Sequence, residues 1–338
     1  MRAYQIVSGA TIHGLRLVDM ESQPVGDSDV KIRVHAVALN RRDLIVANGG
    51  HGPHSGAPLI PCSDAAGEVV AVGRNVTRFK PGDRVINSFF PDWIDGAITV
   101  DKVSRMLGFP TDGVLAEEVV GPEGWWVRIP GHLDYAQAAT MTCTGVTAWN
   151  ALFEQTASKP GDSVLLLGTG GVSMWALLLA KAAGIRTIIT SSSEEKLAHA
   201  RKLGASHGIN YVAHPDWEKE VLRVTDGRGV DAVIDVGGGK TLPQSLAATR
   251  PGGTVAVAGL LSGIATDLDL LALLVYQKRL VGVRGGSRSM LEAMCQFTTA
   301  SHLVPIVDKV FAFSDAVHAY EHLASGAHFG KVVVQVAG

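Results

Sequence analysis

The chain has 338 residues, more than a single hydrophobic core usually organises, so two domains are expected. Hydrophobic residues make up 46% of it and charged residues 18%, which is the composition of a globular protein. Lys and Arg number 30 against 32 Asp and Glu, and the formal net charge of −2 argues against binding to nucleic acid or to an anionic membrane.

The cysteines and the apolar runs indicate the compartment. Cys62, Cys143 and Cys295 are widely spaced and form no CxxC pair of the kind that marks a structural zinc or a redox motif. Residues 1–9 alternate like a strand and lack the layout of a secretion signal. The longest apolar run, 174–180, is too short to cross a bilayer. We therefore expect a soluble, cytoplasmic protein.

The first part of the chain, to about residue 129, is predicted to be rich in β-structure. Short apolar runs are separated by glycines and by a PGD turn at residues 81–83. The predicted strands are 31–38, 67–72, 83–86 and 115–120. Such a series is typical of a barrel-like unit.

The second part alternates strands with helices. Alanine and leucine recur at helical spacing in residues 136–153 and 172–183, and helices are expected to close at Gly184 and Gly204. Short apolar runs that suit strands buried on both faces are 163–167, 186–190, 230–236, 254–259 and 280–283. This alternation predicts an α/β fold with a doubly wound parallel sheet. After Gly286 a mixed tail follows.

A glycine-rich loop in SVLLLGTGGVS (163–173) predicts a dinucleotide site. Gly168 allows a tight turn, and Gly170 and Gly171 lack the Cβ that would keep a pyrophosphate away from the helix N-terminus. Ser173 stands where the usual G-x-G-x-x-G pattern has its third glycine. Glycine turns without a ligand are common, but this one lies between a strand and a helix in a βαβ series. The residues expected to contact the cofactor are Thr169, Gly170, Gly171 and Val172.

The end of the second strand favours NADP(H) over NAD(H). An acidic residue about 20 positions past the glycines normally holds the ribose 2′-hydroxyl, but TIITSSSEEK has no carboxylate at the strand end. Ser192, Ser193 and Lys196 offer hydroxyls and a positive charge that suit a 2′-phosphate. Ser192 and Glu195 also fit an S-x-x-E capping box, which is compatible with phosphate binding at the same helix N-terminus.

The whole chain resembles the medium-chain dehydrogenase/reductase superfamily. The stretches that carry the resemblance are PCSDAAGEVVAVGRNVTRFKPGDRV, GVLAEEVV, CTGVTAWNAL, KPGDSVLLLGTGGVS, ARKLGASHGINY and HFGKVVVQV. The resemblance implies a GroES-like catalytic domain at 1–128 and a Rossmann nucleotide-binding domain at 129–286. It also implies that a C-terminal segment, 287–338, rejoins the catalytic domain.

The same resemblance implies that no metal is bound. In related zinc alcohol dehydrogenases a cysteine, the histidine of Gly-His-Glu and a second cysteine stand at three positions that here carry Asn40, Ser63 and Cys143. Asp64 takes the place of the glutamate. One thiolate does not hold a catalytic zinc, which takes three protein ligands.

Two further features leave the expectation of no metal unchanged. The four close cysteines of a structural zinc lobe are absent from residues 89–108. His51 and His54 have an H-x-x-H spacing, but they lie in a Gly/Pro loop and are expected to be solvent-exposed. Cys62 and Cys143 could be reactive thiols, Cys143 by lying near a helix N-terminus, although small buried side chains are the default.

Without zinc the chain resembles the zinc-independent quinone oxidoreductases and their enone-reducing relatives. These carry an N-x-x-D that Asn40 and Asp43 match, so both residues are the catalytic candidates. Asp43 is equally well explained as a carboxylate that caps a turn. Residues 44–46 are Leu, Ile and Val, whereas those relatives have a tyrosine soon after the aspartate.

The resemblance places further residues near the cofactor. Asn40 and Thr147 are expected near the nicotinamide, and Tyr211 joins Ser192, Ser193 and Lys196 near the 2′-phosphate. The remaining cofactor contacts that it implies are Val236, Gly259, Leu260, Val283, Phe329 and Lys331.

The predicted function is NADPH-dependent, zinc-independent reduction of quinones or α,β-unsaturated carbonyl compounds, with a small molecule as substrate. One alternative is an NADP-dependent alcohol dehydrogenase or carbonyl reductase in which Arg41 or Arg42 polarises the carbonyl. Another is a non-catalytic NADPH-binding sensor. Trp93 is either a wall of the substrate cleft or a packing residue.

The expected assembly is a homodimer or homotetramer. Relatives pair through the edge strand of the nucleotide-binding domain, and the apolar run 268–275 lies near that edge. The same run could equally be an internal helix.

Overall fold

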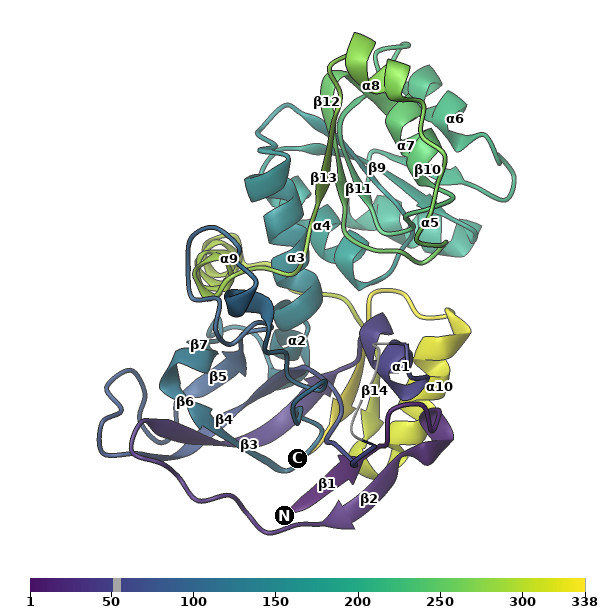
Figure 1. Cartoon of the computed structure of the whole chain (residues 1–338). Coiled ribbons are helices and arrows are strands. Elements are labelled where there is room, and N and C mark those ends of the chain that lie inside the picture. Colours follow the sequence, from purple (N-terminus) through teal and green to yellow (C-terminus); the bar gives the residue numbers. More distant parts are fainter. Residues whose placement is uncertain (51–55, 338) are drawn as a thin grey trace. The chain divides into compact units, whose positions relative to one another are not determined.

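The computed structural model describes residues 1–50 and 56–337, which form two compact units. Unit 1 comprises Met1–Val146 and Gly285–Gly338, and unit 2 comprises Thr147–Arg284. Each is described by itself, and Figure 1 shows the course of the chain through both. Residues 129–146, which the sequence analysis grouped with the nucleotide-binding domain, pack with unit 1.

Unit 1 is built on a seven-stranded sheet. Its order is β14-β15-β3-β4-β5-β7, and β6 pairs with β3. The strands are β3 (Asp29–Ala38), β4 (Asp64–Val72), β5 (Arg84–Asn87), β6 (Glu118–Pro122), β7 (Trp126–Arg128), β14 (Val307–Ala312) and β15 (Lys331–Gln335). A separate ribbon pairs β1 (Arg2–Gln5) with β2 (Arg16–Asp19). The C-terminal segment therefore returns to unit 1, where β15 pairs with β3 and β14 pairs with β15.

The helices of unit 1 come from both of its chain segments, before and after unit 2. They are α1 (Arg41–Ala47), α2 (Tyr135–Ala139), α9 (Arg288–Ala300) and α10 (Ala316–Ser325), with 3₁₀ turns at Ile12–Gly14, Asp101–Val103, Glu123–Trp125 and Phe313–Asp315. Tyr320 of α10 packs in a core that also contains residues of β1, β3 and β15. The long helix predicted at 136–153 is interrupted, because π-helical turns at Met141–Gly145 and Asn150–Gln155 flank the short α3 (Val146–Trp149).

Unit 2 is a doubly wound parallel sheet, as predicted. The six strands run in the order β10-β9-β8-β11-β12-β13, and every pair is parallel. Their bounds are β8 (Ser163–Leu166), β9 (Arg186–Ser191), β10 (His207–Asn210), β11 (Val230–Asp235), β12 (Thr249–Val257) and β13 (Arg279–Gly282). The helices between them are α4 (Gly171–Ala182), α5 (Glu194–Leu203), α6 (Trp217–Val224), α7 (Leu242–Ala248) and α8 (Leu270–Val275).

One strand of unit 2 has no counterpart in the sequence prediction. β10 reads HGIN and lies at the edge of the sheet, where only Ile209 is buried. An edge strand needs no continuous apolar run, so the five-strand prediction missed it. The chain order reverses between β8 and β11, and in open α/β sheets ligands bind beyond the carboxyl ends of the strands at such a point.

None of the helices in the described part of the chain is both long enough and apolar enough to cross a membrane.

Candidate functional site

The glycine-rich loop of unit 2 follows β8 and leads into α4. Gly168 has a φ of 72°, a conformation that favours glycine, and its N–H donates to Thr190 Oγ1 over 3.1 Å. Gly170 is the N-cap of the 12-residue α4, and a Cβ added there would meet no atom within 4 Å. The loop thus leaves open space in front of backbone N–H groups at a helix N-terminus, which fits a pyrophosphate.

Ser173 of α4 stands at the position of the third glycine of the G-x-G-x-x-G pattern. The side chain is buried, and its hydroxyl donates to the carbonyl of Leu167 over 2.6 Å. In the usual pattern glycine at this place allows close packing of helix on strand. Here the hydrogen bond from Ser173 holds α4 against the end of β8. The replacement of glycine by serine therefore leaves the loop intact.

The end of β9 carries the residues predicted to recognise a 2′-phosphate. The N-cap of α5 is Ser193, whose hydroxyl accepts from the N–H of Lys196 at 3.3 Å. The predicted capping box of Ser192 and Glu195 is therefore wrong by one residue. The helix begins later than the pattern suggested, which leaves Ser192 exposed. The N–H of Tyr211 donates to the carbonyl of Ser191 over 3.1 Å and brings that segment alongside.

The remaining predicted cofactor residues of unit 2 lie at the carboxyl ends of β11, β12 and β13. The N–H of Leu261 donates to the carbonyl of Val236 at 3.2 Å, and that of Val283 donates to Val257 at 2.8 Å. A Cβ at Gly259 would lie 2.5 Å from the carbonyl oxygen of Val236, so this close approach requires glycine. Thr147 is buried in α3, and the exposed Leu260 lies beside Gly259.

In unit 1, Asn40 lies where β3 ends and α1 begins. Its N–H donates to Asp43 Oδ2 over 2.7 Å, which caps the helix, while its side-chain Oδ1 accepts from Lys331 Nζ over 2.6 Å. Lys331 also donates to the carbonyl of Leu39. Asn40 is 5% exposed and Lys331 3%, so a buried ammonium holds a buried amide.

Asp64 at the start of β4 is the second polar group of this region. The Ser63 hydroxyl donates to its Oδ1 over 2.6 Å, and the N–H of Cys143 donates to its Oδ2 over 3.1 Å. Burial raises the pKa of Asp64, while the ammonium of Lys331 opposes that rise most strongly. The amide of Asn40 lies near enough to favour the charged carboxylate, although its Nδ2 does not reach hydrogen-bonding geometry.

The carboxyl group of Asp43 has a raised pKa. It is buried in α1, and burial raises its pKa to about 6, opposed first by the Arg42 guanidinium and then by the hydrogen bond from Asn40. Its Oδ1 has no hydrogen-bond partner among the described residues. The hydrogen bond that Oδ2 accepts from the N–H of Asn40 supports the capping interpretation.

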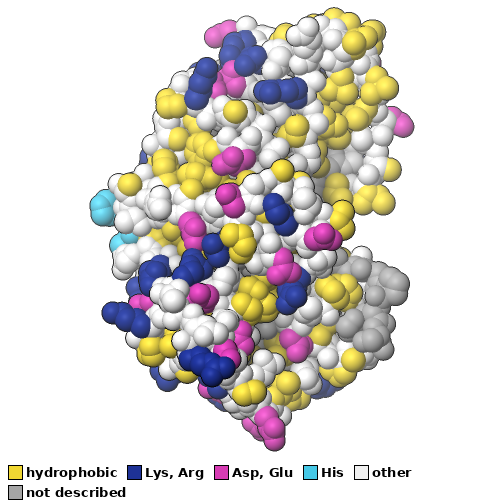
Figure 2. Space-filling model, turned by 60° about the vertical axis from the view of Figure 1, so that its left-hand side comes forward, with side chains coloured by type: hydrophobic (Ala, Val, Ile, Leu, Met, Phe, Trp, Pro, Cys, Tyr) yellow, Lys and Arg dark blue, Asp and Glu magenta, His cyan; other side chains and the backbone are white. Residues whose placement is uncertain are grey.

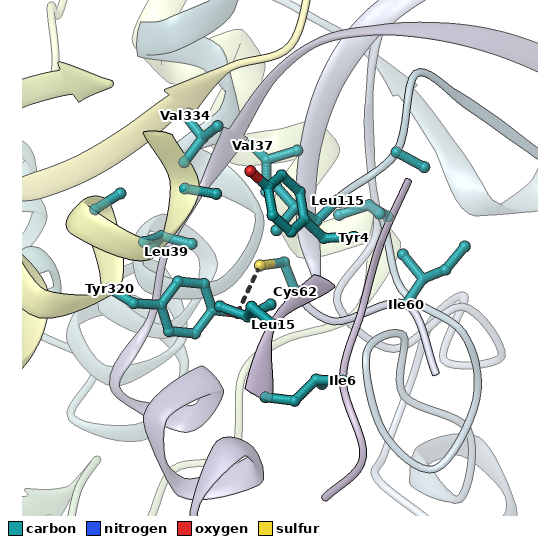
Figure 3. Close-up of a cluster of buried hydrophobic side chains, with 14 of the residues drawn as sticks. Tyr4, Ile6, Leu15, Val37, Leu39, Ile60, Cys62, Leu115, Tyr320 and Val334 are labelled. Atoms are coloured by element: carbon teal, nitrogen blue, oxygen red, sulfur yellow. Dashed lines mark hydrogen bonds between the residues drawn. The ribbon is translucent and has the colours of Figure 1, made fainter. Parts of the chain in front are cut away.

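Cys62 and Cys295 are buried, Cys143 is half-buried, and burial raises the pKa of all three thiols. Figure 3 shows the Cys62 thiol inside the hydrophobic core, 3.2 Å from the hydroxyl of Tyr320. Burial, and then the charge of Asp64, raise the pKa of Cys143, which is the opposite of the shift expected from a helix N-terminus. Burial likewise raises the pKa of Cys295 to about 12.

Other candidate side chains are committed to packing. The Arg42 guanidinium donates to the carbonyls of Leu107 (2.9 Å) and Phe109 (2.8 Å). Trp93 is 4% exposed, and its indole N–H donates to the carbonyl of Gly96. Arg41 is exposed.

Histidines and other side chains that could bind a metal form no cluster in the described part of the chain. His51 and His54 lie outside the described residues. Within residues 1–50 and 56–337, no cluster of three or more His, Cys, Asp or Glu side chains could hold a metal ion.

The N–H of Phe329, a predicted cofactor contact, donates to Asp308 Oδ1 over 2.9 Å.

Comparison with known proteins identifies the family. Residues 26–131 match the alcohol dehydrogenase GroES-like domain and residues 171–300 match the zinc-binding dehydrogenase family. A zinc-type alcohol dehydrogenase-like protein of Schizosaccharomyces pombe is 40% identical over 320 residues, covering 93% of this chain and 92% of the relative. The chain belongs to the medium-chain dehydrogenase/reductase superfamily. The predicted resemblance to this superfamily, the GroES-like domain and the Rossmann-like sheet are thereby confirmed.

Other members of this superfamily are similar along nearly their whole length. A quinone oxidoreductase of Pseudomonas aeruginosa is 31% identical over 327 residues, 94% of each chain. A crystal structure from Sinorhizobium meliloti 1021, described as a candidate alcohol dehydrogenase, has a TM-score of 0.92 at 40% identity and 99% coverage of both chains. An NAD-dependent alcohol dehydrogenase structure also has a TM-score of 0.92, at 34% identity over 100% of both. The chain is thus an oxidoreductase of this superfamily with an NAD(P)-binding domain.

Sequence reasoning missed the inward orientation of Lys331, which it placed among the cofactor contacts. The available signal was a lysine at the head of KVVVQ, a strand whose next three residues are fully buried.

The acidity of Asp43 predicts a pH-dependent stability. Between pH 3.8 and about 6 the folded chain retains a proton on Asp43 that the unfolded chain has lost, so stability falls as the pH rises through this window. Relative to D43N, the wild type should lose on the order of 3 kcal/mol of unfolding free energy between pH 4 and pH 7. Urea unfolding of both proteins at several pH values measures this difference. The exposed Asp267→Asn variant is the control, and a difference between wild type and D43N that is constant with pH would contradict the assignment.

Proposed function

We propose that the protein reduces quinones or α,β-unsaturated carbonyl compounds by hydride transfer from NADPH, without zinc. The observation that carries the proposal is the chemistry at the three positions that hold zinc in related dehydrogenases. The first position carries Asn40, whose side-chain oxygen accepts a hydrogen bond from Lys331. The second carries Ser63, whose hydroxyl donates to Asp64. The third carries Cys143, whose thiol has a raised pKa.

These three side chains do not fit a catalytic zinc. Zinc takes thiolate, imidazole or carboxylate ligands, and its thiol ligands must be deprotonated. An amide and a hydroxyl are weak ligands, which leaves the single thiol of Cys143, and a catalytic zinc takes three protein ligands. The Asp64 carboxylate already accepts two hydrogen bonds.

The absence of a Lewis acid restricts the substrates that react easily. A simple ketone needs help to stabilise the alkoxide that develops as hydride arrives, which zinc gives in related enzymes. In a quinone or an enone the charge spreads over the substrate's own π system to a phenolate or enolate oxygen, which hydrogen-bond donors can hold. The Asn40 amide nitrogen is such a donor, because its oxygen is engaged by Lys331.

The cofactor we propose is NADP(H), and its bound nicotinamide supplies the hydride. Gly170 and the N-terminus of α4 would hold the pyrophosphate, and Ser192, Ser193, Lys196 and Tyr211 the 2′-phosphate. This choice is supported by the lack of a carboxylate at the end of β9 and by the exposed Ser192. Thr147, Val236, Gly259, Leu260 and Val283 are proposed to line the rest.

An alcohol dehydrogenase or carbonyl reductase is the second candidate, since two of the most similar structures are described in those terms. Arg42 gives it little support, because its guanidinium binds two backbone carbonyls. The quinone oxidoreductase of Pseudomonas aeruginosa supports the first candidate.

We also propose that the protein forms a homodimer through unit 2. In α8, Leu270, Leu271, Leu274 and Val275 are between 60% and 76% exposed, and in the neighbouring β13 Leu280 is 37% exposed. Figure 2 shows hydrophobic side chains toward the top, the end at which Figure 1 labels α8. An apolar surface beside an open sheet edge suits a symmetric contact with a second copy.

The zinc-free proposal predicts the outcome of a substrate panel. With NADPH, the protein should reduce 9,10-phenanthrenequinone or an enone and should not oxidise a simple secondary alcohol. Activity should stay within about twofold after EDTA treatment, since no step uses a Lewis acid. Steady-state assays with metal analysis of the same samples measure this. Alcohol oxidation that is lost with EDTA and restored by zinc would overturn the proposal.

The cofactor proposal predicts a selective effect of Lys196. Lys196→Ala should weaken NADPH binding about tenfold and leave NADH binding unchanged, because a charge-assisted contact to the 2′-phosphate is lost. Lys202→Ala, an exposed lysine of the same helix, is the matched control. Fluorescence titration gives the dissociation constants, and an equal loss for both nucleotides would count against a 2′-phosphate contact.

The dimer proposal predicts that a charge on α8 separates the subunits. Leu274→Glu should raise the dimer dissociation constant by about tenfold or more, because a carboxylate would be buried against apolar surface. Val100→Glu changes an 82% exposed side chain of unit 1 and should have no effect. Sedimentation velocity measures both. A wild type that is monomeric at all concentrations would rule out the contact.

A further inference from the structure

Lys331 is a buried ammonium whose place is fixed by the backbone. β15 pairs with β3, and the N–H of Leu39 donates to the carbonyl of Val332 over 2.9 Å. This register sets Lys331 beside residues 39 and 40, although 291 positions of sequence separate it from Asn40. Burial of an ammonium is costly unless it is paired and hydrogen-bonded, so its position requires partners.

The partners of Lys331 are an amide, a carbonyl and nearby carboxylates. Nζ donates to Asn40 Oδ1 over 2.6 Å and to the carbonyl of Leu39. Its charge acts on Asp64 and, more weakly, on Asp43, with Arg42 as the other cation of the region. Cys143 also lies within its field. The ammonium thus sits in a polar cluster of unit 1 that contains the family's former ligand positions.

An ammonium has three donors and no acceptor, so it can contact only the oxygen of an amide. Asparagine could otherwise present either end of its amide to a ligand. With Oδ1 occupied by Lys331, the atom that remains is Nδ2, which is buried, lies near the Asp64 carboxylate and makes no hydrogen bond of proper geometry among the described residues. Lys331 therefore decides that residue 40 acts as a donor and not as an acceptor.

We propose that Lys331 is a positioning residue that turns the Asn40 amide so that Nδ2 donates to the substrate oxygen on which negative charge develops. This inference rests on the proposed function, because it assigns Asn40 as the donor for an enolate or phenolate oxygen. A preorganised donor aimed at that oxygen stabilises the transition state more than the ground state.

The test is a double-mutant cycle on Lys331 and Asn40. Lys331→Met keeps the length of the stem and removes the donors, and it should lower kcat for the quinone or enone about 100-fold with a much smaller change in KM. In the N40A background the same substitution should change kcat less than about threefold, because Lys331 acts through Asn40. Lys80→Met, at an exposed lysine of unit 1, is the control.

Conservative replacement separates positioning from general stability. Lys331→Arg retains a donor in a different geometry and should lower kcat less than Lys331→Met, again only when Asn40 is present. If Lys331→Met does not fold, Lys331→Arg takes its place in the double-mutant cycle. Equal losses in the Asn40 and N40A backgrounds, or full kcat in K331M, would overturn the proposal.

A measurement without turnover keeps the two hypotheses apart. The side-chain amide of Asn40 is identified in ¹⁵N-labelled protein as the signal missing from N40A. It should shift or broaden in a Lys331 variant and stay in place in K80M. An unchanged signal would overturn the role of Lys331, whereas a wild type with a responsive signal but no activity on any quinone or enone would overturn only the proposed function.

Discussion

The contact between Lys331 and Asn40 is the constraint on which the polar cluster of unit 1 depends. It joins the last strand of the sheet to the start of the first helix, and it places a positive charge beside Asp64 and Asp43 in a region nearly closed to water. Buried carboxylates without such a cation would tend to take up protons. One ammonium group therefore binds the oxygen of the Asn40 amide and opposes most strongly the rise in the pKa of Asp64 that burial causes.

The positions that hold zinc in related dehydrogenases belong to an internal hydrogen-bond network in this chain. Ser63 donates to Asp64, Asn87 donates to the carbonyl of Ser63, and the backbone of Cys143 donates to the other oxygen of Asp64. A metal ion in this place would have to compete with these hydrogen bonds, and buried polar groups that lose their partners are costly. The network supports a site organised around hydrogen bonds instead of a Lewis acid.

Local features of the structure followed from the sequence, whereas contacts between distant segments did not. Strands such as Ser163–Leu166 are continuous apolar runs, and the turn at Gly168 requires a positive φ, so both could be predicted. The start of α5 differed by one position, because three consecutive serines can each cap a helix and only packing selects Ser193.

The site was predictable in its members but not in its arrangement. Asn40 and Asp43 stand three residues apart, so one motif marks both. The partner of Asn40 lies 291 positions away, and KVVVQ indicates a buried strand but not which residue its lysine contacts. Likewise the acidity of Asp43 arises from burial, which the sequence alone does not reveal. Topology, not local pattern, brings Lys331 to Asn40.

The insertion of β15 beside β3 also sets the order of events during synthesis. Unit 1 is discontinuous, and the whole of unit 2 is translated between its two parts. In a chain still held on the ribosome, all strands of the Rossmann sheet can be present before Lys331 is available to Asn40. The contact between Lys331 and Asn40 therefore requires residue 331, whereas every strand of the parallel sheet precedes that residue in the chain.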